Sequence, residues 1–324
     1  MAAYVTRLAP SPTGALHLGN ARSFLVAWLR ARTRGGKVIM RIEDLAHPKH
    51  KPETVAEIYA DLRWLGLDWD EGDDLTPPGG NAPYTQTRRL PLYRAALEKL
   101  LAAGRIYPCD CSRADIAAAG AAPHAGEELR YPNTCRGRVW EKPFPELADD
   151  ARLAWRFIAP SGRKVFTDNF RGAESADLQE FSGDFVVARG FANPAYQLAC
   201  VVDDAAMGVT EVIRGDDLVL STFRQIALYE ALRLPVPEFL HLPLLVGEDG
   251  RRLAKRHGDT RLSQLRARKI PAGRLRGWLA RVSGWIDHDA ELTMEEMLRL
   301  YALEKIPENP VVVTARDREY LGFV

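Results

Sequence analysis

Two polar residues, His17 and Asn20, lie three positions apart where a turn rich in proline and glycine (RLAPSPTGALHLGNAR, residues 7–22) leads into an apolar-periodic segment. If that segment is a helix, both side chains lie on one face of its first turn, beside backbone N–H groups without helical partners. The positive end of the helix dipole favours an anion there. A nucleotide phosphate would be stabilised there, but the spacing alone favours a capped turn with an incidental histidine.

A second pattern in the same stretch concerns glycine. Gly14 and Gly19 have the G-x-x-x-x-G spacing of a P-loop, but Asn20 and Ala21 follow where a P-loop requires Lys and then Ser or Thr. Without those two side chains the phosphates and the magnesium ion lose their usual contacts. A Walker-type NTPase is therefore not expected.

Three of the four cysteines fall close together, at Cys109, Cys111 and Cys135. So few cysteines in a chain of 324 residues do not resemble a disulfide framework, which favours a reducing compartment with a local metal site. Thiolates two residues apart can bind one zinc ion from a tight turn, and a structural zinc site takes four ligands. Inert buried thiols are the alternative, and Cys200, in an apolar run, is interpreted as one.

Positive charge is concentrated late in the chain. The formal net charge is only +1, yet residues 251–281 carry eleven Lys or Arg against one acid, Asp259. This region is either a solvated helical surface or a face that binds phosphates. The sequence has neither a secretory leader pattern nor an apolar run long enough for a membrane span, so we expect a cytoplasmic protein with no membrane partner.

The N-terminal elements that must position these residues form a βαβ unit. The expected elements are a strand at 4–8, a helix at 16–34 that ends at Gly35-Gly36, and a strand at 37–42. Two further helices are expected, one spanning Val55 to Leu65 with Gly66 as its left-handed cap, and one at 92–103 that ends at Gly104.

The rest of the chain is less regular. Residues 112–150 are rich in Ala, Gly and Pro and have little periodicity, which is typical of an inserted module. The other expected elements are a strand at 152–158, two buried strands within 196–215, a helix at 222–232, Arg-rich helices from residue 261, and an irregular tail from Pro307.

The opening stretch resembles that of glutamate-specific class I aminoacyl-tRNA synthetases, whose first motif is a His-Ile-Gly-His-like tetrapeptide, here His17-Leu18-Gly19-Asn20. The resemblance continues through RIEDLAHPK (41–49), LGLDWDEG (65–72), YTQTRRLPLYRAALEKLLAAGRIYPCDC (84–111), GVTEVIRGDDL (208–218) and HLPLLVGEDGRRLAKRHG (241–258). It implies an α/β fold with a Rossmann-type parallel sheet, an inserted zinc-binding or acceptor-type module, a C-terminal helical region like the stem-contact region, and no anticodon-binding domain.

The last of these segments carries the second class I motif, similar to Lys-Met-Ser-Lys-Ser, as Arg252-Leu253-Ala254-Lys255-Arg256. A basic loop after a GEDG turn suits the binding of departing pyrophosphate, and Lys255 is the candidate cation. Arg252 and Ala254 depart from the motif, which removes a point charge and a hydroxyl. The resemblance places ATP against five residues, namely Thr13, His17, Gly19, Asn20 and Lys255, with His17, Asn20 and Lys255 in the catalytic roles.

The resemblance also implies a glutamate site, made of Arg7, Ser11, Glu43, Tyr196 and Arg214. Arg clamps a carboxylate through two hydrogen bonds, and an acid binds the ammonium group. Arg7, Glu43 and Arg214 end strands, so they are expected to meet at the carboxyl edge of the parallel sheet. A structural salt bridge from Arg41 to Glu43 or Asp44 is the alternative, and it can coexist with substrate binding.

For zinc, the family arrangement is Cys-x-Cys with Tyr-x-x-x-Cys, which Cys109, Cys111, Tyr131 and Cys135 match. His124 is the other candidate for the fourth ligand, because phenolate is an uncommon zinc ligand. The implied division of the chain is a split catalytic domain at 1–105 and 185–240, an inserted module at 106–184, and a second-motif and helical region at 241–324.

The resemblance implies that ATP, with Mg²⁺, activates L-glutamate to glutamyl-adenylate. The chain ends 69 residues after Lys255. It therefore resembles the shortened paralogues that attach glutamate to the queuosine base at the wobble position of tRNA(Asp), and we expect a monomer whose basic region contacts RNA phosphates. The alternatives are a minimal synthetase that charges the 3′ end of tRNA(Glu) and a non-catalytic amino-acid-sensing or RNA-binding relic.

Overall fold

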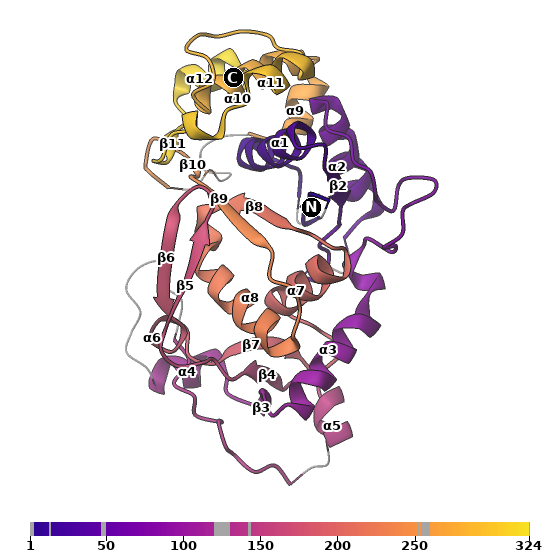
Figure 1. Ribbon diagram of the computed structural model, residues 1–324, viewed down its shortest axis with the longest axis vertical. Helices are drawn as coiled ribbons and strands as arrows, with labels where there is room; N and C mark the ends of the chain where they lie inside the picture. The colour runs from indigo at the N-terminus through magenta and orange to yellow at the C-terminus, as the bar shows by residue number, and fades with distance from the viewer. Residues whose placement is uncertain are drawn as a thin grey trace.

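The computed structural model describes residues 3–12, 14–46, 50–119, 130–141, 144–251, 253 and 260–323. The molecule is elongated, with the C-terminal helices at one end, a small antiparallel sheet at the other, and a parallel sheet between them (Figure 1). No helix in these ranges is both long enough and apolar enough to cross a bilayer.

The central sheet confirms the expected parallel arrangement. β1 (Val5–Leu8) pairs in parallel with β2 (Lys37–Met40), and β8 (Glu211–Gly215) pairs in parallel with β9 (Glu238–Leu242). The two pairs join where the N–H of Thr210 donates to the carbonyl of Val5 at 2.9 Å. β5 (Arg163–Asp168) adds to β9, and β6 (Gly172–Asp177) runs antiparallel to β5 at the edge.

Alternate residues of these strands pack into two separate cores, because successive side chains of a strand point to opposite faces. Val38, Met40 and Leu240 belong to the core that includes α1 (Leu18–Thr33) and α2 (Pro52–Leu65). Ile39, Val212 and Phe239 belong to the core that includes α3 (Leu90–Ala102), α7 (Tyr196–Ala206) and α8 (Val219–Leu232). The predicted βαβ unit and the helices at 55–65, 92–103 and 222–232 are confirmed.

One predicted strand is wrong. Residues 196–206 form the helix α7, and only the second half of the 196–215 stretch is a strand, β8. Leu198, Val201, Val202 and Ala205 have the i, i+3, i+4, i+7 spacing of an amphipathic helix, and eleven residues are long for a strand. The apolar run concealed this spacing because Ala199 and Cys200 fill the remaining positions.

The small sheet consists of β3 (Ile106–Cys109), β4 (Ala154–Phe157) and β7 (Phe185–Arg189), all antiparallel, with α4 (Arg113–Ala119), α5 (Phe144–Asp149) and α6 (Leu178–Phe181) in the same part of the chain. The strand expected at 152–158 is therefore confirmed. β4 pairs with β7 and β5 pairs with β9, so strand pairing crosses the expected boundary at residue 184. The division into domains stays a prediction.

The C-terminal region contains α9 (Leu262–Ala267), α10 (Ala272–Val282), α11 (Met294–Leu300) and α12 (Ala315–Tyr320), and it packs against α1 and α2. The expectation of an irregular tail from Pro307 is wrong. β11 (Val311–Val312) pairs in parallel with β10 (Leu245–Val246), and Val313 is fully buried. Three short 3-10 helices complete the described structure: η1 (Gln86–Arg88), η2 (Asp216–Leu218) and η4 (Leu303–Lys305).

Candidate active site

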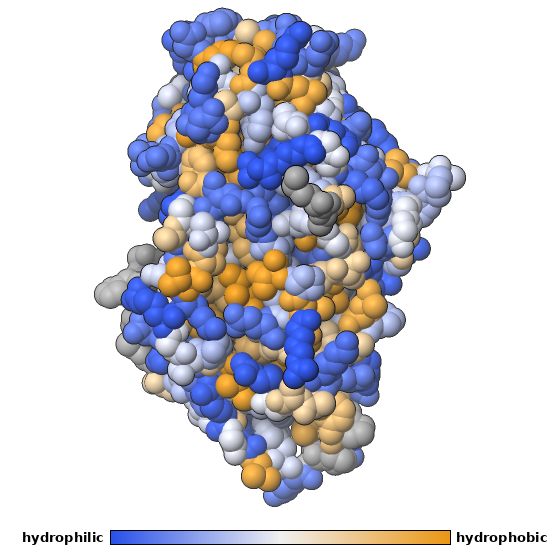
Figure 2. Space-filling model, in the orientation of Figure 1, coloured by the Kyte–Doolittle hydropathy of each residue, from blue (hydrophilic) through white to orange (hydrophobic). Residues whose placement is uncertain are grey.

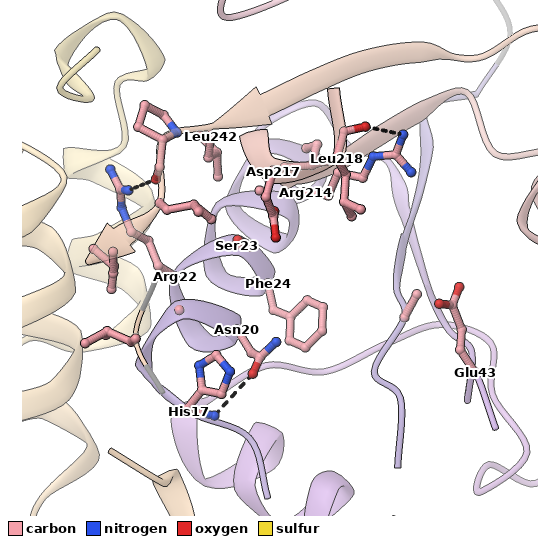
Figure 3. A pocket seen from close by; sticks show the side chains of 18 of the residues that line it. His17, Asn20, Arg22, Ser23, Phe24, Glu43, Arg214, Asp217, Leu218 and Leu242 are labelled. Atoms are coloured by element: carbon pink, nitrogen blue, oxygen red, sulfur yellow. Dashed lines mark hydrogen bonds between the residues drawn. The ribbon is translucent and has the colours of Figure 1, made fainter. Parts of the chain in front are cut away.

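A pocket lies between the start of α1 and the carboxyl ends of the parallel strands (Figure 3). The predicted site residues that line it are Arg7, His17, Gly19, Asn20, Glu43, Tyr196 and Arg214. Ser11 is exposed and is not among the lining residues. Thr13 and Lys255 fall outside the described residues, as do Arg252 and Ala254.

The start of α1 is shaped by its own side chains. His17 is the N-cap, in an extended backbone conformation, and its N–H donates to Oδ1 of Asn20 at 3.3 Å. The chain that follows the second motif returns here, since the N–H of Leu18 donates to the carbonyl of Thr260 at 3.2 Å. Leu253 also lines the pocket, although it is more than 230 residues from His17 in the sequence.

A network of buried ion pairs forms part of the pocket wall. Arg41 is fully buried, and it donates to Oε1 of Glu43 at 2.9 Å and to Oδ1 of Asp204 at 2.6 Å. The same oxygen of Asp204 lies 3.4 Å from Nε of Arg7. Burial would raise the pKa of Asp204, but Arg41 and Arg7 outweigh it and hold that pKa below its usual range. The salt bridge from Arg41 to Glu43 that the sequence offered as an alternative is therefore present, within the pocket wall.

Cys200 belongs to this network, because its thiol lies 3.6 Å from Oε1 of Glu43. The thiol is buried, and burial raises its pKa well above the usual value. The group is therefore neutral and unreactive at neutral pH, which agrees with its interpretation as an inert buried thiol.

Arg214, on the other side of the pocket, is held by neutral groups. Its Nε donates to Nε2 of His241 at 3.1 Å, one Nη donates to Oγ1 of Thr222 at 2.7 Å, and the other lies 3.5 Å from the hydroxyl of Tyr196. The arginine side chain is almost fully buried. Figure 3 shows Arg214 and Glu43 across the cavity from His17 and Asn20, with the ring of Phe24 projecting between them.

Sequence reasoning missed several residues of the site. One of them is Asp204, at the end of the apolar run of α7. The acid pair Asp203-Asp204 in an otherwise apolar stretch was the sequence signal that could have identified it. Arg22 also lines the pocket, and it ties α1 to the C-terminal region by donating to the carbonyl of Pro243 at 2.7 Å and to Oγ of Ser283 at 3.3 Å. Burial lowers the pKa of Arg22 to about 10, so the side chain keeps its charge at neutral pH.

The three clustered cysteines converge at the base of the small sheet. Their sulfur atoms all lie within 4.8 Å of one another, with Cys111 and Cys135 3.5 Å apart. The hydroxyl of Tyr131 lies 3.3 Å from Sγ of Cys109 and 3.8 Å from Sγ of Cys111. A tetrahedral zinc ion with bonds of about 2.3 Å to sulfur holds its ligands about 3.8 Å apart, so this donor set fits zinc. His124 lies outside the described residues.

Several cations of residues 251–281 form ion pairs with acids of the same chain. Arg266 pairs with Asp61, Arg274 pairs with Glu291, and Arg281 pairs with Asp289. Hydrophilic side chains predominate at this end of the molecule (Figure 2). At the turn after α9, Arg268 donates to the carbonyl of Gly322 and Lys269 is exposed. Fewer charges are therefore available for a polyanion than the sequence suggests.

Comparison with known proteins gives consistent matches. A family model described as tRNA synthetases class I (E and Q), catalytic domain, matches residues 3–316. The proteins named Glutamyl-Q tRNA(Asp) synthetase from Symbiobacterium thermophilum and Nitratidesulfovibrio vulgaris are 49% and 44% identical to this chain, over 95% of each chain. The Glutamate--tRNA ligase of an Anaeromyxobacter species is 40% identical, over 93% of this chain and 62% of its own length.

Solved structures match as well. The crystal structure of the glutamate-tRNA synthetase from Elizabethkingia anophelis superposes with a TM-score of 0.81 at 27% identity. The match covers 98% of this chain and 70% of that chain.

Proposed function

Because the chain belongs to the family of class I synthetase catalytic domains for glutamate and glutamine, we propose that it activates L-glutamate with ATP and transfers the glutamyl group to the queuosine base at the wobble position of tRNA(Asp). The relatives that carry this activity in their name support the acceptor, since they are 44–49% identical over 95% of both chains. One observation carries the activation step: the buried side chains of Arg7, Arg214 and Glu43 line the same pocket as the start of α1.

Glutamate presents two carboxylates and one ammonium group, and the pocket offers matching charges. Arg7 and Arg214 are the cations for the carboxylates, and Glu43 is the acid for the ammonium group. Tyr196, at the first turn of α7, adds a hydroxyl. Ser11 is proposed to contact the amino acid, although its side chain is exposed in this structure.

ATP is proposed to lie over the turn of His17, Gly19 and Asn20, with Thr13 as a further ATP-binding residue. The α-carboxylate of glutamate attacks the α-phosphorus, the bond to the bridging oxygen breaks, and pyrophosphate leaves. No protein nucleophile is needed, because the substrate supplies the attacking oxygen. The protein contributes positioning, for which His17 is a candidate, and preorganised positive charge, for which Lys255 is the candidate. Mg²⁺ bound to the phosphates supplies further charge neutralisation.

The donors Cys109, Cys111, Tyr131 and Cys135 are proposed to hold one structural zinc ion. Their spacing supports this role, and the described part of the chain contains no second cluster of potential metal ligands. The cluster lies at the end of β3, so zinc would fix the turn that follows this strand.

An exchange assay tests the activation step. Purified protein is incubated with labelled pyrophosphate, ATP and one amino acid, in the absence of RNA. Label entering ATP with glutamate, and not with glutamine or aspartate, is expected. Lack of exchange with every amino acid would instead favour a non-catalytic relic, and exchange with glutamine or aspartate would refute the substrate.

A further inference from the structure

Arg214 has only neutral groups around its charge. Its partners are the imidazole of His241, the hydroxyls of Thr222 and Tyr196, and the carbonyl of Leu218. No carboxylate among the described residues lies within 4.0 Å of its guanidinium, whereas Arg7 and Arg41 share Asp204. A buried charge without a counter-ion is costly unless a ligand supplies one. The charge of Arg214 is therefore available to an anionic group of the substrate.

His241 gives Arg214 a hydrogen-bond acceptor without giving it a negative charge. Its Nδ1 donates to Oδ2 of Asp168 at 2.6 Å, which leaves Nε2 as the acceptor for Nε of Arg214 at 3.1 Å. Both His241 and Asp168 have fully buried side chains. Burial lowers the pKa of His241, and Arg214 lowers it further against the opposing effect of Asp168. The imidazole is therefore neutral at pH 7.

Asp168 cannot rotate to reverse this arrangement. Its other oxygen, Oδ1, accepts the N–H groups of Phe170 and Arg171 at 2.9 Å and of His241 at 3.2 Å. The ring of Phe239 stacks on the imidazole, with an angle of 12° between the planes. Asp168 thus fixes which ring nitrogen of His241 carries the proton.

From this geometry we propose that Asp168 and His241 are positioning residues for substrate binding: they fix the guanidinium plane of Arg214 and leave its charge uncompensated for a carboxylate of the amino acid. The inference rests on the proposed function, because it assigns Arg214 to the substrate. A carboxylate in direct contact with Arg214 would neutralise the charge of the guanidinium. The imidazole ring of His241 instead separates the charge of Asp168 from the guanidinium. The chain Asp168–His241–Arg214 thereby serves binding of the substrate rather than only packing.

The sharpest test is Asp168→Asn, which keeps the shape of the side chain. Oδ1 must remain an oxygen because it accepts three N–H groups, so the new NH₂ group faces Nδ1 of His241. The histidine must then carry its proton on Nε2, where it meets the N–H of Arg214. Two donors facing each other displace the guanidinium, as a wrong tautomer does in other buried Asp–His pairs.

In the exchange assay we expect Asp168→Asn to raise the KM for glutamate by about tenfold to a hundredfold, with the KM for ATP changed less than about twofold. His241→Leu, which removes the acceptor, should have the same effect. His241→Gln can donate to Asp168 and accept from Arg214, so it should keep the KM for glutamate within about threefold of wild type.

The matched control is Asp184→Asn. Asp184 is also fully buried and also accepts a backbone N–H, but its side-chain donor is Arg136 and it lies at the small sheet. The Asp184→Asn substitution should lower the melting temperature without changing the KM for glutamate. The inference is overturned if Asp168→Asn behaves like this control, or if His241→Leu and His241→Gln have equal KM values. If Asp168→Asn does not fold, the comparison of the two His241 variants decides. Failure of the proposed function appears separately, as absence of exchange in the wild-type protein.

Discussion

Asp204 binds Arg41 inside the pocket wall, with Nη1 of the arginine 2.6 Å from Oδ1 of the carboxylate. The same oxygen faces Arg7, so one buried acid positions Arg7, which is in β1, and Arg41, which directly follows β2. Through Arg41 it also positions Glu43. The site thus depends on an acid that is itself too far inside the wall to line the pocket.

Asp204→Asn should damage both stability and substrate binding, because it removes the charge that Arg7 and Arg41 share. Breaking a buried ion pair costs about 3–5 kcal/mol, and we expect the free energy of unfolding in urea to fall by about that amount. The KM for glutamate in the exchange assay should rise by about tenfold. Asp149→Asn is the control, because Asp149 pairs with Arg94 on the surface, where such a pair is worth at most about 1 kcal/mol.

The pairing of Asp204 with Arg41 and Arg7 also predicts how the free energy of unfolding depends on pH. Arg41 and Arg7 hold the pKa of Asp204 below its usual value of 3.8, so its stabilising contribution is present above about pH 4 and is lost as the pH falls through the lowered pKa. In the Asp204→Asn variant, the decrease in unfolding free energy that comes from protonation of Asp204 should be absent. Equal slopes of unfolding free energy against pH in wild type and variant, below about pH 4, would contradict the assignment.

His17→Ala should slow adenylate formation with little effect on glutamate binding, since His17 lies at the start of α1 while Arg214 lies across the cavity (Figure 3). Removal of one preorganised donor to a developing charge costs about 100-fold to 1,000-fold in kcat. The exchange assay measures kcat and both KM values. The exposed His288 provides the control variant, His288→Ala, which should leave all three constants unchanged. A His17→Ala enzyme with wild-type kcat would remove His17 from the proposed mechanism.

The fold and the site were predictable from the sequence to different degrees. The βαβ unit, the left-handed cap at Gly66 and the clustered cysteines follow from local patterns, namely periodicity, glycine placement and residue spacing. α7 was missed because a continuous apolar run reads equally as a buried strand or a buried helix. The hydrogen-bond chain from Asp168 through His241 to Arg214 could not be predicted. Asp168 and His241 are 73 residues apart, and only the pairing of β5 with β9 brings them together.

Zinc content tests the cysteine cluster. The wild-type protein should contain about one zinc ion per chain, measured by elemental analysis, and Cys111→Ser should lose it together with part of the thermal stability. Tyr131→Phe removes only the weakest donor, so the variant protein should still bind zinc, but more weakly than the wild type. Cys200→Ser is the matched control and should retain zinc. Full zinc content in Cys111→Ser would refute the proposed ligand set.

The turn after α9 tests the contact with RNA. Lys269→Gln should weaken binding of tRNA(Asp) and lower the slope of log affinity against log salt concentration by about 0.7–0.9 for the lost phosphate contact. Exchange without RNA should not change. Arg274→Gln serves as the control, because Arg274 is already paired with Glu291. An unchanged salt dependence in the Lys269→Gln variant would place the RNA elsewhere on the protein.

The acceptor is tested most directly by following labelled glutamate. The protein is incubated with ATP, labelled glutamate and one of three RNAs: tRNA(Asp) with queuosine, tRNA(Asp) without queuosine, or tRNA(Glu). Nuclease mapping then locates the label. Label on the anticodon loop of tRNA(Asp), dependent on queuosine, is the predicted result. Label at the 3′ end of tRNA(Glu) would contradict it.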